Sequence, residues 1–131
     1  MKLAYLGISL CLLASTAAEA AEGEPADMVR PSEAIRHVGE FAMVCGVIAS
    51  ARWLHNSRGG PTYLNFDKPY PDQDFTVVIW GKDRGEFAAA PETLTGYKAC
   101  AYGKIESYKG KAQIVARRQE QLNYTAPGNG R

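Results

Sequence analysis

The sequence predicts a small all-β barrel of five strands. Short runs of β-branched and aromatic residues recur along the chain, turn-forming Gly, Pro, Asn and Asp residues separate them, and 131 residues leave room for one domain. The expected strands span residues 41–53, 62–66, 75–80, 97–108 and 112–117.

The second and last strands show the pattern most clearly. Alternation in the second strand directs Leu64 and Phe66 inward and Tyr63 and Asn65 outward. A tight turn at 108–111 joins the last two strands into a hairpin.

Two short helices accompany the strands. Ser32 is a plausible N-cap for a helix over 33–38. A second short helix is expected between the third and fourth strands, within 83–90, with Phe87 packing on the barrel and Pro91 after its end.

The first 20 residues predict a cleavable signal peptide. Lys2 gives a positive start, 3–14 is apolar but short for a bilayer span, and Ala18-Glu19-Ala20 has the small-x-small form of a cleavage site. The alternative is a membrane anchor, but no stop-transfer pattern follows. We therefore expect a periplasmic or secreted protein.

The remaining chain divides into three parts. Residues 21–31 are expected to be a flexible leader, 32–122 the folded domain and 123–131 a flexible tail rich in Gly, Pro and Asn.

Cysteine usage fits export. Cys11 would leave with the signal peptide, and Cys45 and Cys100 would remain. An even pair in an exported protein indicates a disulfide, and two buried free thiols are the alternative.

Charge limits the class of partner. The net charge is +1, and loss of residues 1–20 removes one Lys and one Glu, so it is unchanged. Nucleic acid would therefore have to bind a local patch. One candidate lies between residues 98 and 118, where Glu106 is the only acid; ordinary solvated strand faces are the alternative. Its basic residues are Lys98, Lys104, Lys109, Lys111, Arg117 and Arg118.

Four segments carry a resemblance to a known family. VCGVI at 44–48, YLNF at 63–66, FTVVI at 75–79 and CAYGKIESYKGKAQI at 100–114 resemble small bacterial OB-fold proteins described as nucleic-acid-binding, of the tRNA-anticodon-binding-like kind. The resemblance covers roughly residues 35–122. It implies a five-stranded OB-fold barrel with three strands in a meander, a closing helix and a terminal hairpin.

The resemblance also bears on the disulfide, because the first and fourth strands of an OB fold are neighbours. Strict alternation nevertheless turns Cys100 outward and places Cys45 on the same face as Val47, expected inside. A bridge then requires a bulge at Gly46 or Gly103 to reverse the phase of one strand.

OB barrels hold single strands with aromatic platforms and cationic side chains. The candidate nucleic-acid-binding residues are Trp53, Arg58, Tyr63, Asn65, Trp80, Tyr102, Lys104, Tyr108, Lys109 and Lys111. The alternative is that the tryptophans complete the core edge and the tyrosines are cross-strand partners. Asp67, Asp72 and Asp74 near the same face would repel phosphate.

No catalytic set is recognisable, so we expect a binding protein that is not an enzyme and has no cofactor. A nuclease would need acidic metal ligands and converging arginines, and the chain offers them only in a Pro-rich loop and at strand ends. His37 and His55 have no partner at metal-ligand spacing, so no metal site is expected.

Two functions follow. The first is weak binding of single-stranded DNA or RNA, with little sequence preference, by an exported OB-fold protein. The second is an exported OB module that binds a protein partner, a sugar or a small ligand. The compartment favours the second, while the basic hairpin and the aromatic residues favour the first.

Overall fold

The computed structural model describes residues 28–127 together with residues 4, 7 and 11. The predicted signal peptide, residues 1–20, otherwise lies outside the described residues. The strands are β1 (Met28–Val29), β2 (Phe41–Trp53), β3 (Thr62–Phe66), β4 (Phe75–Ile79), β5 (Lys98–Lys104), β6 (Glu106–Tyr108), β7 (Lys111–Val115) and β8 (Leu122–Thr125). The 3₁₀ helices are η1 (Pro31–His37), η2 (Gly81–Glu86), η3 (Pro91–Thr93) and η4 (Gln119–Gln121).

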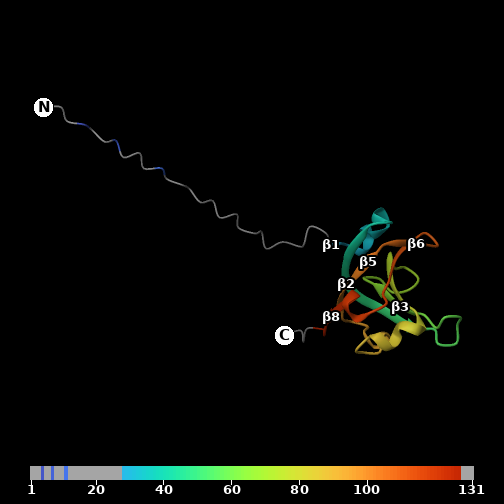
Figure 1. The fold of residues 1–131 in the computed structure, drawn as a ribbon. Coiled ribbons are helices and arrows are strands. Elements are labelled where there is room, and N and C mark those ends of the chain that lie inside the picture. The colour runs from blue at the N-terminus through green and yellow to red at the C-terminus, as the bar shows by residue number, and fades with distance from the viewer. Residues whose placement is uncertain (1–3, 5–6, 8–10, 12–27, 128–131) are drawn as a thin grey trace.

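The strands form one eight-stranded sheet that curls around a single interior (Figure 1). Its hydrogen-bonded path runs β6-β7-β4-β3-β2-β5-β8, with β1 beside β2. The β4–β7 and β1–β2 pairs are parallel, and the other pairs are antiparallel. This confirms the predicted all-β, OB-like architecture. The five expected strands correspond to β2, β3, β4, β5 with β6, and β7.

The sheet is not closed by hydrogen bonds, but the chain joins its two halves at Ile105. This residue alone separates β5, which pairs with β2, from β6, which pairs with β7. Its side chain is fully buried. Its backbone N–H donates to the Glu40 carbonyl at 2.9 Å, and its carbonyl accepts from the Gly39 N–H at 2.8 Å. The single strand predicted over 97–108 is therefore two strands with different partners.

The fold extends beyond the predicted domain on both sides. In the segment predicted as a leader, β1 pairs with β2, and Val29 is buried opposite Val44. At the other end, β8 pairs with β5 and reaches Thr125, inside the segment predicted as a tail. Both strands satisfy backbone groups on the edges of their neighbours.

The leading helix forms, but as a 3₁₀ helix that starts at Pro31 and not after Ser32. Arg30 is its N-cap and makes no side-chain capping hydrogen bond. The helix is anchored by burial, because Pro31 and Ala34 face the interior.

Two 3₁₀ helices, η2 and η3, replace the single helix predicted between the third and fourth strands. Phe87 lies between them and packs against the core, as predicted. In Figure 1, η1 and η2 lie at opposite ends of the barrel.

The core follows the predicted alternation. Leu64 and Phe66 of β3 are fully buried, and Phe66 meets its cross-strand partner Phe75 edge to face, with ring centroids 5.2 Å apart. All five residues of β4 are buried, which fits its central place in the sheet.

Cys45 and Cys100 form a disulfide directly across the β2–β5 pair. Both side chains are on the outer face, since their neighbours Val44 and Ala101 are fully buried in the core. The expectation that Val47 faces inward is wrong, because 39% of it is exposed. Because both cysteines face outward, they can form the disulfide without a bulge that reverses the alternation of either strand. A disulfide is typical of proteins from oxidising compartments.

The prediction of a bulge at Gly46 or Gly103 is wrong. The β2–β5 register runs without a shift through Gly46 and Gly103, and the irregularity lies between Ile48 and Ser50 on the β3 side. Gly46 has a different role: a Cβ there would lie 2.6 Å from Asp67 Oδ1, which accepts a hydrogen bond from the Val47 N–H. The missing side chain makes room for this contact.

Replacing both cysteines, Cys45→Ser with Cys100→Ser, should lower the free energy of unfolding by about 4 kcal/mol, because the bridge closes a loop with a sequence separation of 55. Urea unfolding followed by tryptophan fluorescence measures the loss. A reductant should lower the midpoint of the parent protein and leave that of the double variant unchanged. Equal midpoints for the oxidised parent and the variant would contradict the expectation.

Candidate functional site

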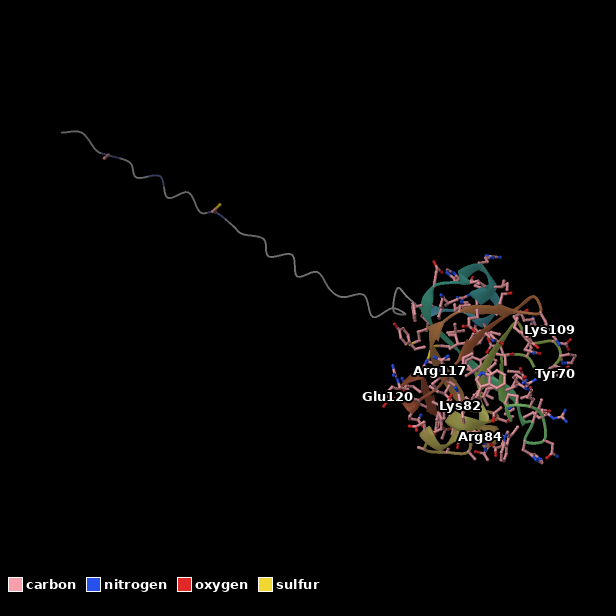
Figure 2. All side chains as sticks on the ribbon, turned by 45° about the vertical axis from the view of Figure 1, so that its right-hand side comes forward. Tyr70, Lys82, Arg84, Lys109, Arg117 and Glu120 are labelled. Carbon is pink, nitrogen blue, oxygen red and sulfur yellow. A yellow bond between two sulfur atoms is a disulfide. The ribbon has the colours of Figure 1, made fainter. Side chains whose placement is uncertain are left out.

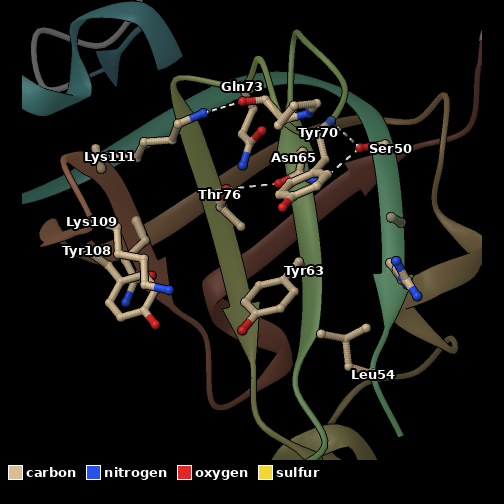
Figure 3. A pocket seen from close by; sticks show the side chains of 15 residues that line it. Ser50, Leu54, Tyr63, Asn65, Tyr70, Gln73, Thr76, Tyr108, Lys109 and Lys111 are labelled. Atoms are coloured by element: carbon tan, nitrogen blue, oxygen red, sulfur yellow. Dashed lines mark hydrogen bonds between the residues drawn. The ribbon is translucent and has the colours of Figure 1, made fainter. Parts of the chain in front are cut away.

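A groove of about 660 Å³ lies on the outer face of the barrel, over β2, β3, β4 and β7 (Figure 3). The loop 67–74 and the β6–β7 hairpin border it, and Figure 3 shows Tyr70 and Lys109, from these two elements, on opposite sides of the groove. Figure 2 places the same two residues on the surface of the whole barrel. We call it the tyrosine groove. Its lining is Ser50, Ala51, Arg52, Leu54, Tyr63, Asn65, Tyr70, Pro71, Gln73, Thr76, Tyr108, Lys109, Lys111, Ala112 and Gln113.

Strand register creates a polar row across the groove floor. Ser50 pairs with Asn65, Asn65 with Thr76 and Thr76 with Gln113, on four adjacent strands. Thr76 Oγ1 donates to Asn65 Oδ1 at 2.9 Å, and Asn65 Nδ2 donates to Ser50 Oγ at 2.9 Å. The backbone N–H of Tyr70 also donates to Ser50 Oγ, at 3.1 Å. These bonds fix the floor and tie the 67–74 loop to it.

Three tyrosines surround this floor, each from a different element. Tyr63 belongs to β3, Tyr70 to the 67–74 loop and Tyr108 to the end of β6. Tyr70 is 72% exposed and Tyr108 is 56% exposed. Exposed rings on separate elements can each serve as a stacking platform.

The groove is cationic. Arg52, Lys109 and Lys111 belong to its lining, which includes no Asp or Glu. None of the ion pairs found among the described residues involves these three side chains. Lys111 Nζ donates to the Pro71 carbonyl and holds the loop toward the hairpin, and Lys109 Nζ lies 5.3 Å from the centroid of the Tyr108 ring.

The three aspartates expected to repel phosphate lie outside the groove lining. Asp67 accepts the Val47 N–H, and Asp74 pairs with Lys68 at 3.1 Å. Asp72 is exposed on the same loop. None of the three carboxylates therefore lines the groove in which a phosphate would bind.

The predicted tight turn at 108–111 is confirmed. Lys109 and Gly110 both have positive φ, of 49° and 79°, as in the two-residue hairpin turns that favour Asn-Gly. A lysine there is unfavourable for the backbone, but it places a cation at the rim of the groove.

The structure brings together half of the predicted binding residues. Those in the groove are Tyr63, Asn65, Tyr108, Lys109 and Lys111. Those outside its lining are Trp53, Arg58, Trp80, Tyr102 and Lys104.

The tryptophans belong to another part of the surface. Arg84 Cζ lies 3.6 Å from the Trp53 ring centroid, and Trp53 Nε1 donates to the Gly60 carbonyl at 3.2 Å. Trp80 lies against Gly59, and Arg58 is exposed on the same loop. Both tryptophans are exposed, at 39% and 36%, so they contact neighbouring loops and do not complete the core edge.

Tyr102 and Lys104 lie on the outer side of β5, where their cross-strand partners are Met43 and Phe41. Both are exposed. They therefore provide matched controls for substitutions in the groove.

The sequence reasoning missed Arg52, Tyr70 and Gln73 as groove residues. Arg52 is the cross-strand partner of Tyr63, a signal that becomes readable only once the bulge in β2 is known. Tyr70 and Gln73 lie in a loop whose Pro-rich composition gives no direction for its side chains.

No cluster of three or more His, Cys, Asp or Glu side chains among the described residues is placed to hold a metal ion. In the same residues, no helix is long and apolar enough to span a membrane.

No family model matches the chain, and no curated protein matches it by sequence. Among solved structures, it is similar to a protein from Leishmania major described as an aspartyl-tRNA synthetase, with a TM-score of 0.52 and 7% identity. The match covers 83% of this chain and 22% of the other. This likeness supports the OB-like fold and nothing beyond it.

Asn65→Ala should lower the free energy of unfolding by about 1–3 kcal/mol, because it removes the hydrogen bonds that Asn65 makes with the Thr76 and Ser50 hydroxyls. The control is Gln113→Ala in the same row, whose side chain makes none of the hydrogen bonds found among the described residues. It should change stability by less than about 0.5 kcal/mol. Urea unfolding of both variants measures the difference, and equal losses would show that the row contributes no stability.

Proposed function

We propose that the protein binds single-stranded nucleic acid weakly in the tyrosine groove, as a binding protein and not as an enzyme. One observation carries the proposal: three tyrosines and three cations surround one groove whose lining has no acidic residue. Bases would stack on the tyrosines, and Arg52, Lys109 and Lys111 would neutralise the phosphates.

The free energies expected from stacking and from phosphate neutralisation are sufficient for modest affinity. Stacking of a base on an aromatic side chain contributes about 1–3 kcal/mol, so two or three tyrosines together with the neutralised phosphates would give weak binding after the cost of association. Three neutralised phosphates would give a slope of about −2 for log K against log salt concentration on a single strand. Weak binding with strong salt dependence is the expected signature.

The comparison with solved structures adds support at the level of the fold. The similar protein, described as an aspartyl-tRNA synthetase, supports the OB-like fold, and OB folds in general hold single strands on this face of the barrel. The inference to this chain rests on its own groove residues.

We also propose that the protein works outside the cytoplasm, in the periplasm or after secretion, once residues 1–20 are removed as a signal peptide. The Cys45–Cys100 disulfide supports an oxidising compartment. The charged start, short apolar run and small-x-small site support the export route.

A second candidate function uses the same groove for a sugar, a small ligand or a protein segment. Its volume of about 660 Å³ falls in the range of small-molecule pockets, which supports this alternative. A neutral ligand would bind without the steep salt dependence expected for nucleic acid.

The substitution Lys109→Asn should separate charge from backbone effects. It removes one cation while creating the Asn-Gly pair that this turn favours, so stability should be retained or increased. Binding of a fluorescent single-stranded oligonucleotide at low and moderate salt should weaken, with the salt slope reduced by about 0.7. Lys104→Asn on β5 is the matched control and should change neither affinity nor slope.

Tyr70→Ala should reduce affinity for the same oligonucleotide by about 5- to 150-fold, because it removes one stacking platform. Tyr102→Ala, an exposed tyrosine outside the groove, should leave affinity unchanged. Absence of binding by the parent protein at low salt would refute the proposed function. Binding that is weakened equally by both variants would place the site elsewhere.

A further inference from the structure

Among the described residues that line the groove, one buried side-chain atom has no hydrogen-bond partner. Gln73 is 7% exposed, and its Oε1 is buried without a hydrogen bond. We propose that Gln73 hydrogen-bonds the Watson–Crick edge of one base held in the groove, so that the site accepts unpaired bases and rejects paired ones. This proposal rests on the proposed function.

Three polar side chains of the groove floor already bond to one another. The hydroxyls of Ser50 and Thr76 and the Asn65 amide form one hydrogen-bonded row. A buried acceptor without a donor is unfavourable, and such groups are uncommon in native proteins. An N–H supplied by a ligand would remove this penalty and convert it into affinity.

The loop that carries Gln73 is held in place on both sides. The Tyr70 N–H bonds to Ser50, Lys111 bonds to the Pro71 carbonyl, and Gln73 lies two residues before β4 begins at Phe75. Figure 3 shows the Gln73 side chain near Tyr70, within the group of residues that lines the groove. The terminal torsion of a glutamine is broad, so the amide can turn Oε1 toward a ligand while its stem stays fixed.

The chemistry of a primary amide explains why the site would be tolerant of sequence. The amide offers one acceptor and one donor side by side. Adenine and cytosine present an amino donor next to a ring-nitrogen acceptor, and thymine and uracil present an N3–H donor next to a carbonyl. Each of these edges matches a glutamine, provided that it is not already paired with another base. The site would therefore discriminate between paired and unpaired bases more strongly than between one base and another.

The test compares two single strands of equal length, oligo(dT) and the same strand with N3-methylthymine. The methyl group removes the N3–H donor and leaves the stacking face intact. The parent protein should bind the methylated strand about 5- to 50-fold more weakly, the effect of leaving a buried acceptor unpaired. A preformed oligo(dT)·oligo(dA) duplex should also bind more weakly than the unmethylated oligo(dT) single strand.

Gln73→Met provides the complementary variant, because it keeps the length of the side chain and removes the amide. It should bind the two strands equally and should unfold at the same or a higher urea concentration, since a buried unpaired oxygen is lost. The comparison of strands on the parent protein needs no variant and remains decisive if Gln73→Met fails to fold. Equal binding of both strands by the parent would overturn the role of Gln73 and leave the proposed function standing. Binding of neither strand would refute the proposed function itself.

Discussion

The bulge in β2 between Ile48 and Ser50 decides which side chains reach the groove. Before it, Val44 and Ile48 face the core and Cys45 faces outward. After it the phase is reversed, so Ser50 and Arg52 join the outer faces of β3 and β4. Without this extra residue the polar row would lack Ser50 and the groove would lose Arg52. One irregularity in one strand thus lets the same strand hold the disulfide at one end and the binding face at the other.

Two further features, the disulfide and Ile105, connect the strands on the other side of the barrel to those that carry the groove. The disulfide ties β2 to β5, and Ile105 lets the chain pass from β5 to β6 without leaving the barrel wall. The pair β6–β7 then carries Tyr108, Lys109 and Lys111 to the groove rim. The interior of the barrel is filled mainly by apolar side chains, and the outer faces of β3, β4 and β7 carry polar side chains together with the cation Lys111.

Periodicity and turn chemistry were sufficient for much of the fold. β3 was predicted residue for residue, and the Lys109–Gly110 turn was predicted from its composition. The phase of β2 was not predictable, because a bulge leaves no reliable mark in sequence and Gly46, the apparent mark, serves close packing against Asp67. The inward placement of Val47 is a separate error, because Val47 precedes the bulge and its register with β5 is regular. The 67–74 loop was beyond prediction for a different reason: tertiary hydrogen bonds to Ser50 and from Lys111 set its path.

Two features of the groove are unfavourable for folding and lie within one site. Lys109 adopts a positive φ that suits Asn or Gly, and Gln73 buries an unpaired oxygen. Each costs stability by a separate mechanism, backbone strain in the first case and lost hydrogen bonding in the second. An unpaired base would relieve the second cost, and the strained turn places one of the cations that a phosphate would need. Locally unfavourable features gathered at one site are the pattern expected of a binding site, and they favour the groove over the other exposed aromatic residues of the barrel.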